Sequence, residues 1–145
     1  GSWVKIAQLE GSMTANYRVA TTPDTFYAFA IEAYKGDPSN VSARTQYSTY
    51  SASSAPEGFS VNAVSANTIS ASWNGKSGVG YYIQWATDEN FTQNVNGAFL
   101  TGSGATNYTI DLDDHDTYYI RVRAWKWYQD QRLFSDFSAP VQITK

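Results

Sequence analysis

The sequence predicts an all-β sandwich, because its clearest pattern has a period of two and because that pattern occurs twice in the chain. From Tyr118 to Trp125, side chains of different character alternate strictly. One side of this run carries Tyr118, Ile120, Val122 and Ala124, and the other carries Tyr119, Arg121, Arg123 and Trp125. A period of two over this length indicates a strand with one buried and one solvent-facing side.

The second occurrence lies 91 residues earlier, where Tyr27 corresponds to Tyr118 and Ile31 to Val122. An offset of 92 aligns the Asp-Thr pairs of the two runs, but it sets inward Phe29 against outward Arg121. A shift of one residue moves a strand's apolar set to the wrong face, so 91 is preferred. The chain is therefore predicted to contain an internal repeat, with 55–145 as one full period and 1–54 as a truncated copy.

Composition excludes several classes of protein. With 42% hydrophobic and 16% aromatic residues, the 145-residue chain is too apolar to be disordered. A formal charge of -3 and the lack of a basic stripe argue against nucleic-acid binding. There are no cysteines and no apolar run long enough to span a membrane. Gly1-Ser2 resembles a cloning remnant, so we expect the chain to be part of a longer protein.

In the truncated copy, short apolar runs separated by turn residues predict four strands. They cover 3–9, 17–19, 27–33 and 41–50, with turns at 10–12 and 35–40. In the full copy, the inward residues of the first three strands are expected to be Phe59 and Val61, then Ile69, Ala71 and Trp73, then Tyr81, Ile83 and Trp85. Later strands are expected at 94–100, 108–110, 118–126 and 138–143.

Leu112 lies six residues before Tyr118, a spacing that resembles the tyrosine corner of β-sandwich domains. Together with Trp73, Tyr81-x-Ile83 and Arg121–Ala124, it resembles a fibronectin type III module. The run 118–126 followed by 134–138 is similar to type III repeats of secreted bacterial surface proteins and polysaccharide-active enzymes. The resemblance implies an immunoglobulin-like β-sandwich at 55–145, preceded by the C′, E, F and G strands of a partial module at 1–54. Thr21 replaces the corner leucine in the partial copy.

Catalysis finds no support in the sequence. The only histidine, His115, lies in an acidic turn, and no cysteine nucleophile exists. The acids Asp111, Asp113, Asp114 and Asp116 share that turn instead of facing each other across a cleft, as glycoside hydrolysis requires. We predict that the protein is not an enzyme and needs no cofactor. Whether the turn at 111–116 binds Ca²⁺ stays open, although no EF-hand spacing is present.

The outward face of the predicted sheet holds the candidate binding residues Tyr82, Tyr119, Arg121, Arg123 and Trp125. Aromatic rings beside polar groups are suited to a sugar-binding platform. However, Phe134-Ser135-Asp136-Phe137-Ser138 resembles the Trp-Ser-x-Trp-Ser pattern of cytokine-receptor type III modules, in which arginines stack between rings. We therefore favour a ladder in which Arg121 and Arg123 stack on aromatic side chains of the same chain.

These features predict a non-catalytic spacer or adhesion module of a larger secreted or cell-surface protein, with a protein or polysaccharide as its ligand. The alternative is a carbohydrate-binding module that uses the aromatic face. The truncated copy should leave Tyr27, Phe29 and Ile31 uncovered. We expect another chain to complete it, as a strand-exchanged dimer or a separate piece. Packing of that face onto the second copy is less favoured.

Overall fold

The computed structural model describes residues 2–9 and 16–145, and within them the secondary structure is all strand, without a helix. The ten strands are β1 (Phe26–Ile31), β2 (Thr45–Tyr50), β3 (Ser60–Ser65), β4 (Thr68–Ser72), β5 (Gly80–Ala86), β6 (Asn96–Leu100), β7 (Asn107–Asp111), β8 (Thr117–Tyr128), β9 (Gln131–Phe134) and β10 (Val141–Thr144). The all-β prediction is confirmed.

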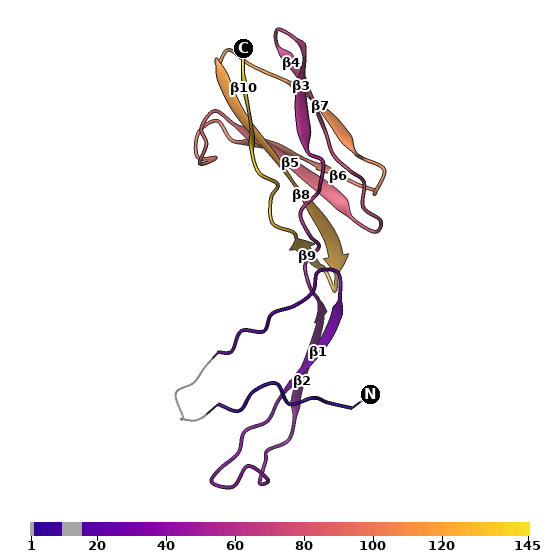
Figure 1. The fold of residues 1–145 in the computed structure, drawn as a ribbon, viewed down its shortest axis with the longest axis vertical. Coiled ribbons are helices and arrows are strands. Elements are labelled where there is room, and N and C mark those ends of the chain that lie inside the picture. The colour runs from indigo at the N-terminus through magenta and orange to yellow at the C-terminus, as the bar shows by residue number, and fades with distance from the viewer. Residues whose placement is uncertain (1, 10–15) are drawn as a thin grey trace.

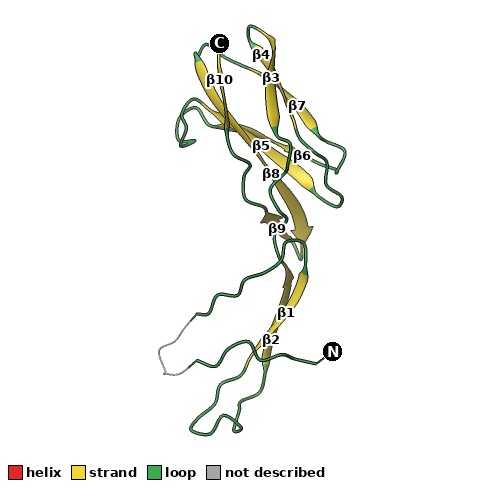
Figure 2. Cartoon of the chain, viewed as in Figure 1, coloured by secondary structure: helices red, strands yellow, loops and turns green. Residues whose placement is uncertain are grey.

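Strands β3–β10 form a sandwich of two sheets (Figures 1 and 2). One sheet has the order β10-β8-β5-β6, with β9 also paired to β8, and the other has the order β3-β4-β7. A single core lies between them. Its buried residues are Ile69, Ala71, Trp73, Val79, Tyr81, Ile83, Ile110, Leu112, Tyr118, Ile120, Val122 and Ala124. We call residues 55–145 the sandwich and residues 1–54 the N-terminal segment.

Strand β8 is the centre of the larger sheet, because β5, β9 and β10 all pair with it. Its inward residues Tyr118, Ile120, Val122 and Ala124 are all buried, as the alternation predicts. Burying a large apolar side chain stabilises a fold by about 1.5–3 kcal/mol, so this strand anchors the core. The predicted inward residues of β4 and β5 are also buried, except that Trp85 is only partly buried and packs against the core.

The end of the larger sheet differs from the prediction of one strand over 138–143. Strand β8 continues to Tyr128, turns through Gln129 and Asp130, and returns as β9. Both turn residues have positive φ, 45° and 60°, which is the requirement of a two-residue type I′ hairpin. Such turns usually contain Asn-Gly, so Gln-Asp gave no signal. Strand β10 then begins only at Val141.

The N-terminal segment contains one hairpin, in which β1 pairs antiparallel with β2 and Phe29 faces Tyr47 across the pair. The predicted strands at 3–9 and 17–19 are wrong, because these residues adopt no strand. Their equivalents β6 and β7 pair with β5 and β4, and the described part of the segment offers no such strands. The predicted turn at 10–12 lies outside the described residues. No described residue before Ser51 is buried.

The hairpin and the sandwich each contain a hydrogen bond between a tyrosine hydroxyl and the backbone, at positions 91 residues apart. The hydroxyl of Tyr27 accepts a hydrogen bond from the backbone N–H of Thr22, five residues earlier, at 2.9 Å. The hydroxyl of Tyr118 donates to the carbonyl of Asp113, also five residues earlier, at 2.9 Å. Each tyrosine is therefore bonded to the backbone of the segment that precedes its strand. In the hairpin this contact forms although Thr21 stands at the position of the corner leucine.

A charged cluster joins the N-terminal segment to the sandwich. The Asp24 carboxylate lies 2.6 Å from Lys76 Nζ and 3.0 Å from Lys126 Nζ, and it accepts a hydrogen bond from Ser53. Partial burial raises the pKa of this carboxyl, but the hydrogen bonds from Lys76, Ser53 and Lys126 outweigh it and hold the pKa well below the ordinary value. Beside this cluster the rings of Tyr50 and Tyr128 meet edge to face, 5.4 Å apart.

Candidate functional site

The sequence-predicted binding residues lie on the larger sheet of the sandwich. Tyr82 is on β5, directly opposite Arg123 on β8, and Tyr119 and Arg121 follow along β8 with their side chains on the same outer face. The structure brings Tyr82, Arg121 and Arg123 into one stack. It separates Tyr119, which pairs with Ala86 at the far end of the β5–β8 ladder.

The stack is a ladder of arginines and aromatic rings. The guanidinium of Arg121 lies between Phe91 and Phe137, 3.7 and 3.9 Å from the ring centroids. That of Arg123 lies 3.8 Å from Phe134 and 4.5 Å from Phe137. Each contact is within the roughly 6 Å of a cation–π interaction, so the predicted ladder is confirmed in its geometry. Phe91, from the loop after β5, is a member that sequence reasoning missed.

Serine hydroxyls hold the aromatic segment against β8. Ser135 Oγ accepts a hydrogen bond from the N–H of Ala124 at 2.9 Å, and Ser138 Oγ accepts one from Val122 at 3.1 Å. The backbone N–H groups of the same serines donate to the carbonyls of Ala124 and Val122. Residues 135–138 thus satisfy the edge of β8 without forming a strand, which leaves Phe134 and Phe137 facing the arginines.

Burial and neighbouring charge act on both arginines. Burial lowers the pKa of Arg121 and of Arg123 below the usual guanidinium value, and their mutual proximity lowers that of Arg121 further. Arginine stays charged in proteins, so the ladder keeps two positive charges. Gln84 Oε1 accepts hydrogen bonds from Nε and an Nη of Arg121 at 2.9 and 2.7 Å. The aromatic faces and the guanidinium groups are therefore largely occupied by each other.

Trp125, predicted on the outer face, does not form an exposed platform. It is only 6% exposed, and its indole N–H donates to the carbonyl of Tyr81 at 3.0 Å. The ring lies against Gly80, where an added Cβ would approach it to 2.7 Å. Because its neighbour has no side chain, the indole lies close to the sheet instead of projecting from it.

Two other aromatic residues are exposed at this end of the sheet. Trp127 is 58% exposed and Phe99 is 46% exposed. The guanidinium of Arg132 lies 4.9 Å from the Trp127 ring and 4.3 Å from the Phe99 ring. Arg132 belongs to β9, a strand that the sequence analysis did not predict, so its stacking on Trp127 and Phe99 was not predicted either. The alternation of β8, extended two residues past Trp125, would have placed Trp127 on this face.

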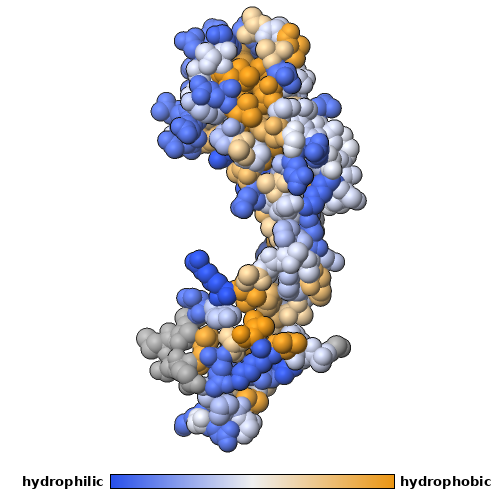
Figure 3. Space-filling view, viewed as in Figure 1, coloured by the Kyte–Doolittle hydropathy of each residue, from blue (hydrophilic) through white to orange (hydrophobic). Residues whose placement is uncertain are grey.

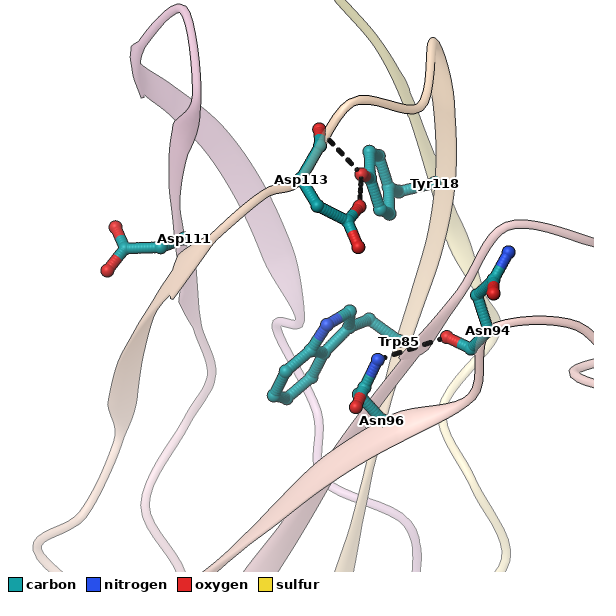
Figure 4. A pocket seen from close by; sticks show the side chains of 6 residues that line it. All are labelled: Trp85, Asn94, Asn96, Asp111, Asp113 and Tyr118. Carbon is teal, nitrogen blue, oxygen red and sulfur yellow. Dashed lines mark hydrogen bonds between the residues drawn. The ribbon is translucent and has the colours of Figure 1, made fainter.

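A small polar pocket lies at the tyrosine corner (Figure 4). It has a volume of about 180 Å³ and is lined by Trp85, Asn94, Asn96, Asp111, Asp113 and Tyr118. Tyr118 OH bonds the carboxylate of Asp113 as well as its carbonyl. Burial and that carboxylate raise the pKa of Tyr118 to about 12, and the hydroxyl lowers the pKa of Asp113.

The calcium hypothesis for 111–116 gains no support from this geometry. The Asp113 carboxylate points toward the Trp85 indole, whereas Asp111 points away from it (Figure 4) and accepts a hydrogen bond from Thr68. Among the described residues, no group of three or more His, Cys, Asp or Glu side chains is arranged to hold a metal ion. Ca²⁺ takes six to eight oxygen ligands, far more than two divergent carboxylates offer.

A model of the fibronectin type III domain matches residues 54–144. The chain belongs to the fibronectin type III family. No curated protein matches it. Three similar solved structures show the same fold. One, described as a myokine structure, is 21% identical with a TM-score of 0.51, and the match covers 63% of this chain and 95% of that one.

The other two similar structures contain several type III domains. A two-domain segment of chicken tenascin is 16% identical with a TM-score of 0.57, covering 84% of this chain and 66% of that one. The FN1–FN3 domains of chicken CNTN1 are 21% identical with a TM-score of 0.51, covering 86% of this chain and 43% of that one. At these identities the likeness concerns the fold alone.

Proposed function

We propose that this fibronectin type III chain is a non-catalytic spacer or adhesion module of a larger secreted or cell-surface protein. The observation that carries the proposal is the cluster around Asp24, which ties the N-terminal segment to the sandwich through two lysines. A spacer must hold its two ends at a defined separation, and ion pairs that bridge the junction restrict its bending. No helix of the described residues is long and apolar enough to cross a membrane.

Catalysis is no part of this proposal. Nε2 of His115 lies 4.0 Å from Asp113 Oδ1, and both side chains are solvent-exposed. General acid–base chemistry requires a titratable group within reach of a bound substrate, usually in a concave site. The pocket beside Asp113 is well below the roughly 300–1,000 Å³ typical of small-molecule sites.

The junction can be tested by small-angle X-ray scattering on the full chain. Asp24→Asn removes the charge that both lysines share, so we expect the distribution of interatomic distances to broaden while the sandwich keeps its fold. Asp37→Asn, in an exposed turn of the same segment, is the matched control and should leave the distribution unchanged. Equal flexibility of the wild type and Asp24→Asn would contradict a semi-rigid spacer.

Carbohydrate binding remains the second candidate, and the exposed pair Trp127 and Phe99 favours it. Tyr82, Arg121 and Arg123 are engaged in the ladder, so a sugar would have to use this end of the sheet instead. Titration of soluble polysaccharides should leave the tryptophan fluorescence unchanged if the protein is a spacer. A saturable shift in the wild type that Trp127→Ala abolishes would support the second candidate.

The N-terminal segment is also part of the proposal. Ile31 of its hairpin is 70% exposed, whereas Val122 at the equivalent position of the sandwich is buried, so we propose that another chain completes the segment.

A further inference from the structure

One edge of β1 is open. On its other edge β1 pairs with β2 along all six residues, Phe26 to Ile31. In the sandwich, the equivalent strand β8 is paired on both edges, by β5 and by β10. No described strand occupies the second edge of β1. Its sequence, Phe-Tyr-Ala-Phe-Ala-Ile, has neither a charge nor a proline, two features that usually prevent pairing at an edge.

The hairpin also exposes apolar side chains. Ile31 is 70% exposed, whereas Tyr27 and Phe29 on the same face of β1 are partly buried and stack their rings 5.8 Å apart, so the expectation of three uncovered side chains is met by Ile31 alone. Phe26, on the opposite face, is half-exposed. Figure 3 shows hydrophobic residues at the surface of this N-terminal half, away from the sandwich. Single exposed apolar residues are ordinary, but exposed apolar residues at both ends of a strand whose edge is open favour an interaction along that strand.

The backbone bonds fix which residues face the open edge. The N–H of Ser51 donates to the carbonyl of Thr25, and that of Ser42 donates to the carbonyl of Ala33, so odd-numbered residues direct their polar groups toward β2. Backbone groups alternate along a strand. The N–H and C=O groups of Ala28 and Ala30 therefore point to the open edge.

We propose that a second copy of this chain pairs with that edge, antiparallel, about a two-fold axis at Phe29. Ala28 of one copy then exchanges backbone hydrogen bonds with the partner's Ala30. Tyr27 faces the partner's Ile31, and the two Phe29 residues face each other. The result is a continuous four-stranded sheet with Tyr27, Phe29 and Ile31 of both copies on one side. The inference rests on the proposal that another chain completes the N-terminal segment and names that chain, whereas the spacer role does not require self-association.

A second copy fits this edge better than an arbitrary strand, because the apolar pattern of β1 is symmetric about Phe29. Reversing the strand places Tyr27 and Ile31 in each other's positions, so the inward set stays on one face. In this register Glu32 faces the partner's Phe26 and Asp24 faces the partner's Tyr34, so no like charges are opposed. A two-fold interface of this kind closes with two copies.

Disulfide trapping tests the register directly, because the chain has no cysteine of its own. Residues 29 of the two copies form a non-hydrogen-bonded pair with Cα atoms about 4.5 Å apart, a separation that a disulfide accepts. Phe29→Cys should therefore form a covalent dimer under oxidised glutathione. Ile31→Cys, on the same face and more exposed, should not dimerise alone but should cross-link when mixed with Tyr27→Cys.

Sedimentation velocity supplies the second readout. The wild type should sediment as a dimer, and Phe29→Lys, which opposes two like charges at the axis, should halve the mass while the tryptophan fluorescence of the sandwich is unchanged. Cross-linking of Ile31→Cys alone as fast as Phe29→Cys would overturn the proposal. A wild type that stays monomeric would also overturn it. If that monomer instead bound a peptide of sequence 80–86, the strand that pairs with β8 at the equivalent edge, the segment would be completed by a separate piece and not by a second copy.

Discussion

At the scale of the residue, burial separates tryptophans that look alike in the sequence. Trp73 is 4% exposed and packs its ring 5.3 Å from Tyr81, whereas Trp127 projects into solvent. The first fills the core, and the second fills none of it. Removing each should therefore have very different consequences for stability.

Trp73→Ala should lower the free energy of unfolding by about 3–5 kcal/mol, the usual cost of deleting a large buried aromatic side chain. Trp127→Ala should change it by no more than about 0.5 kcal/mol, as surface substitutions do. Urea unfolding followed by far-ultraviolet circular dichroism measures both. A Trp73→Ala variant as stable as Trp127→Ala would show that the assigned core is wrong.

The tyrosine corner predicts a dependence on alkaline pH. The pKa of Tyr118 is raised to about 12 in the fold, against about 10 in an unfolded chain. The unfolded chain thus loses this proton first as pH rises, so the stabilisation is complete below pH 10 and declines toward pH 12. Tyr118→Phe should be less stable at neutral pH by roughly 0.5–1.5 kcal/mol and should show a weaker alkaline decline in urea unfolding. An equally steep decline in that variant would assign it to another group.

At the scale of the element, the edge of β8 depends on side chains instead of a full partner strand. Ser135 is buried, and its hydroxyl accepts a hydrogen bond from the N–H of Ala124. Ser135→Ala would leave that N–H without its acceptor, which costs about 1–3 kcal/mol when the group is buried.

Hydrogen exchange measured by nuclear magnetic resonance tests this contact. The Ala124 amide should exchange faster in Ser135→Ala. The Ile83 amide, on β5 along the other edge of β8, should keep its protection. Ser39→Ala, in an exposed turn, is the control. Unchanged protection of Ala124 would mean that the serine hydroxyl does not hold this edge.

Sequence patterns predicted the elements whose outcome depends on local alternation. The inward residues of β4, β5 and β8 followed from a period of two, and the ladder of Arg121 and Arg123 followed from the Phe-Ser-x-Phe-Ser run. Sequence patterns gave wrong predictions where the structure of a segment depends on the segments that lie beside it. Residues 3–9 and 17–19 have strand-like sequences but no strand to pair with. Trp125 is buried because Gly80 lies opposite, and β9 forms because Gln129 and Asp130 accept positive φ, neither of which alternation reveals.

At the scale of the whole molecule, the chain divides into a sandwich with its own core and a hairpin without one. The described residues before Ser51 lie outside the core, and the contacts that join the two parts include those of Asp24 with Lys126 and of Tyr50 with Tyr128. A domain's stability comes mainly from the apolar surface that it buries. The sandwich should consequently fold without the N-terminal segment.

The most direct test compares residues 55–145 alone with the full chain by two-dimensional amide spectra and urea unfolding. We predict that the shorter chain gives the same dispersed spectrum for the sandwich, with shifts confined to the vicinity of Lys76, Lys126 and Tyr128, and that its unfolding free energy changes by less than about 1 kcal/mol, the scale of exposed ion pairs. An unfolded or strongly destabilised 55–145 would contradict the account, because it would place part of the sandwich's core in residues 1–54.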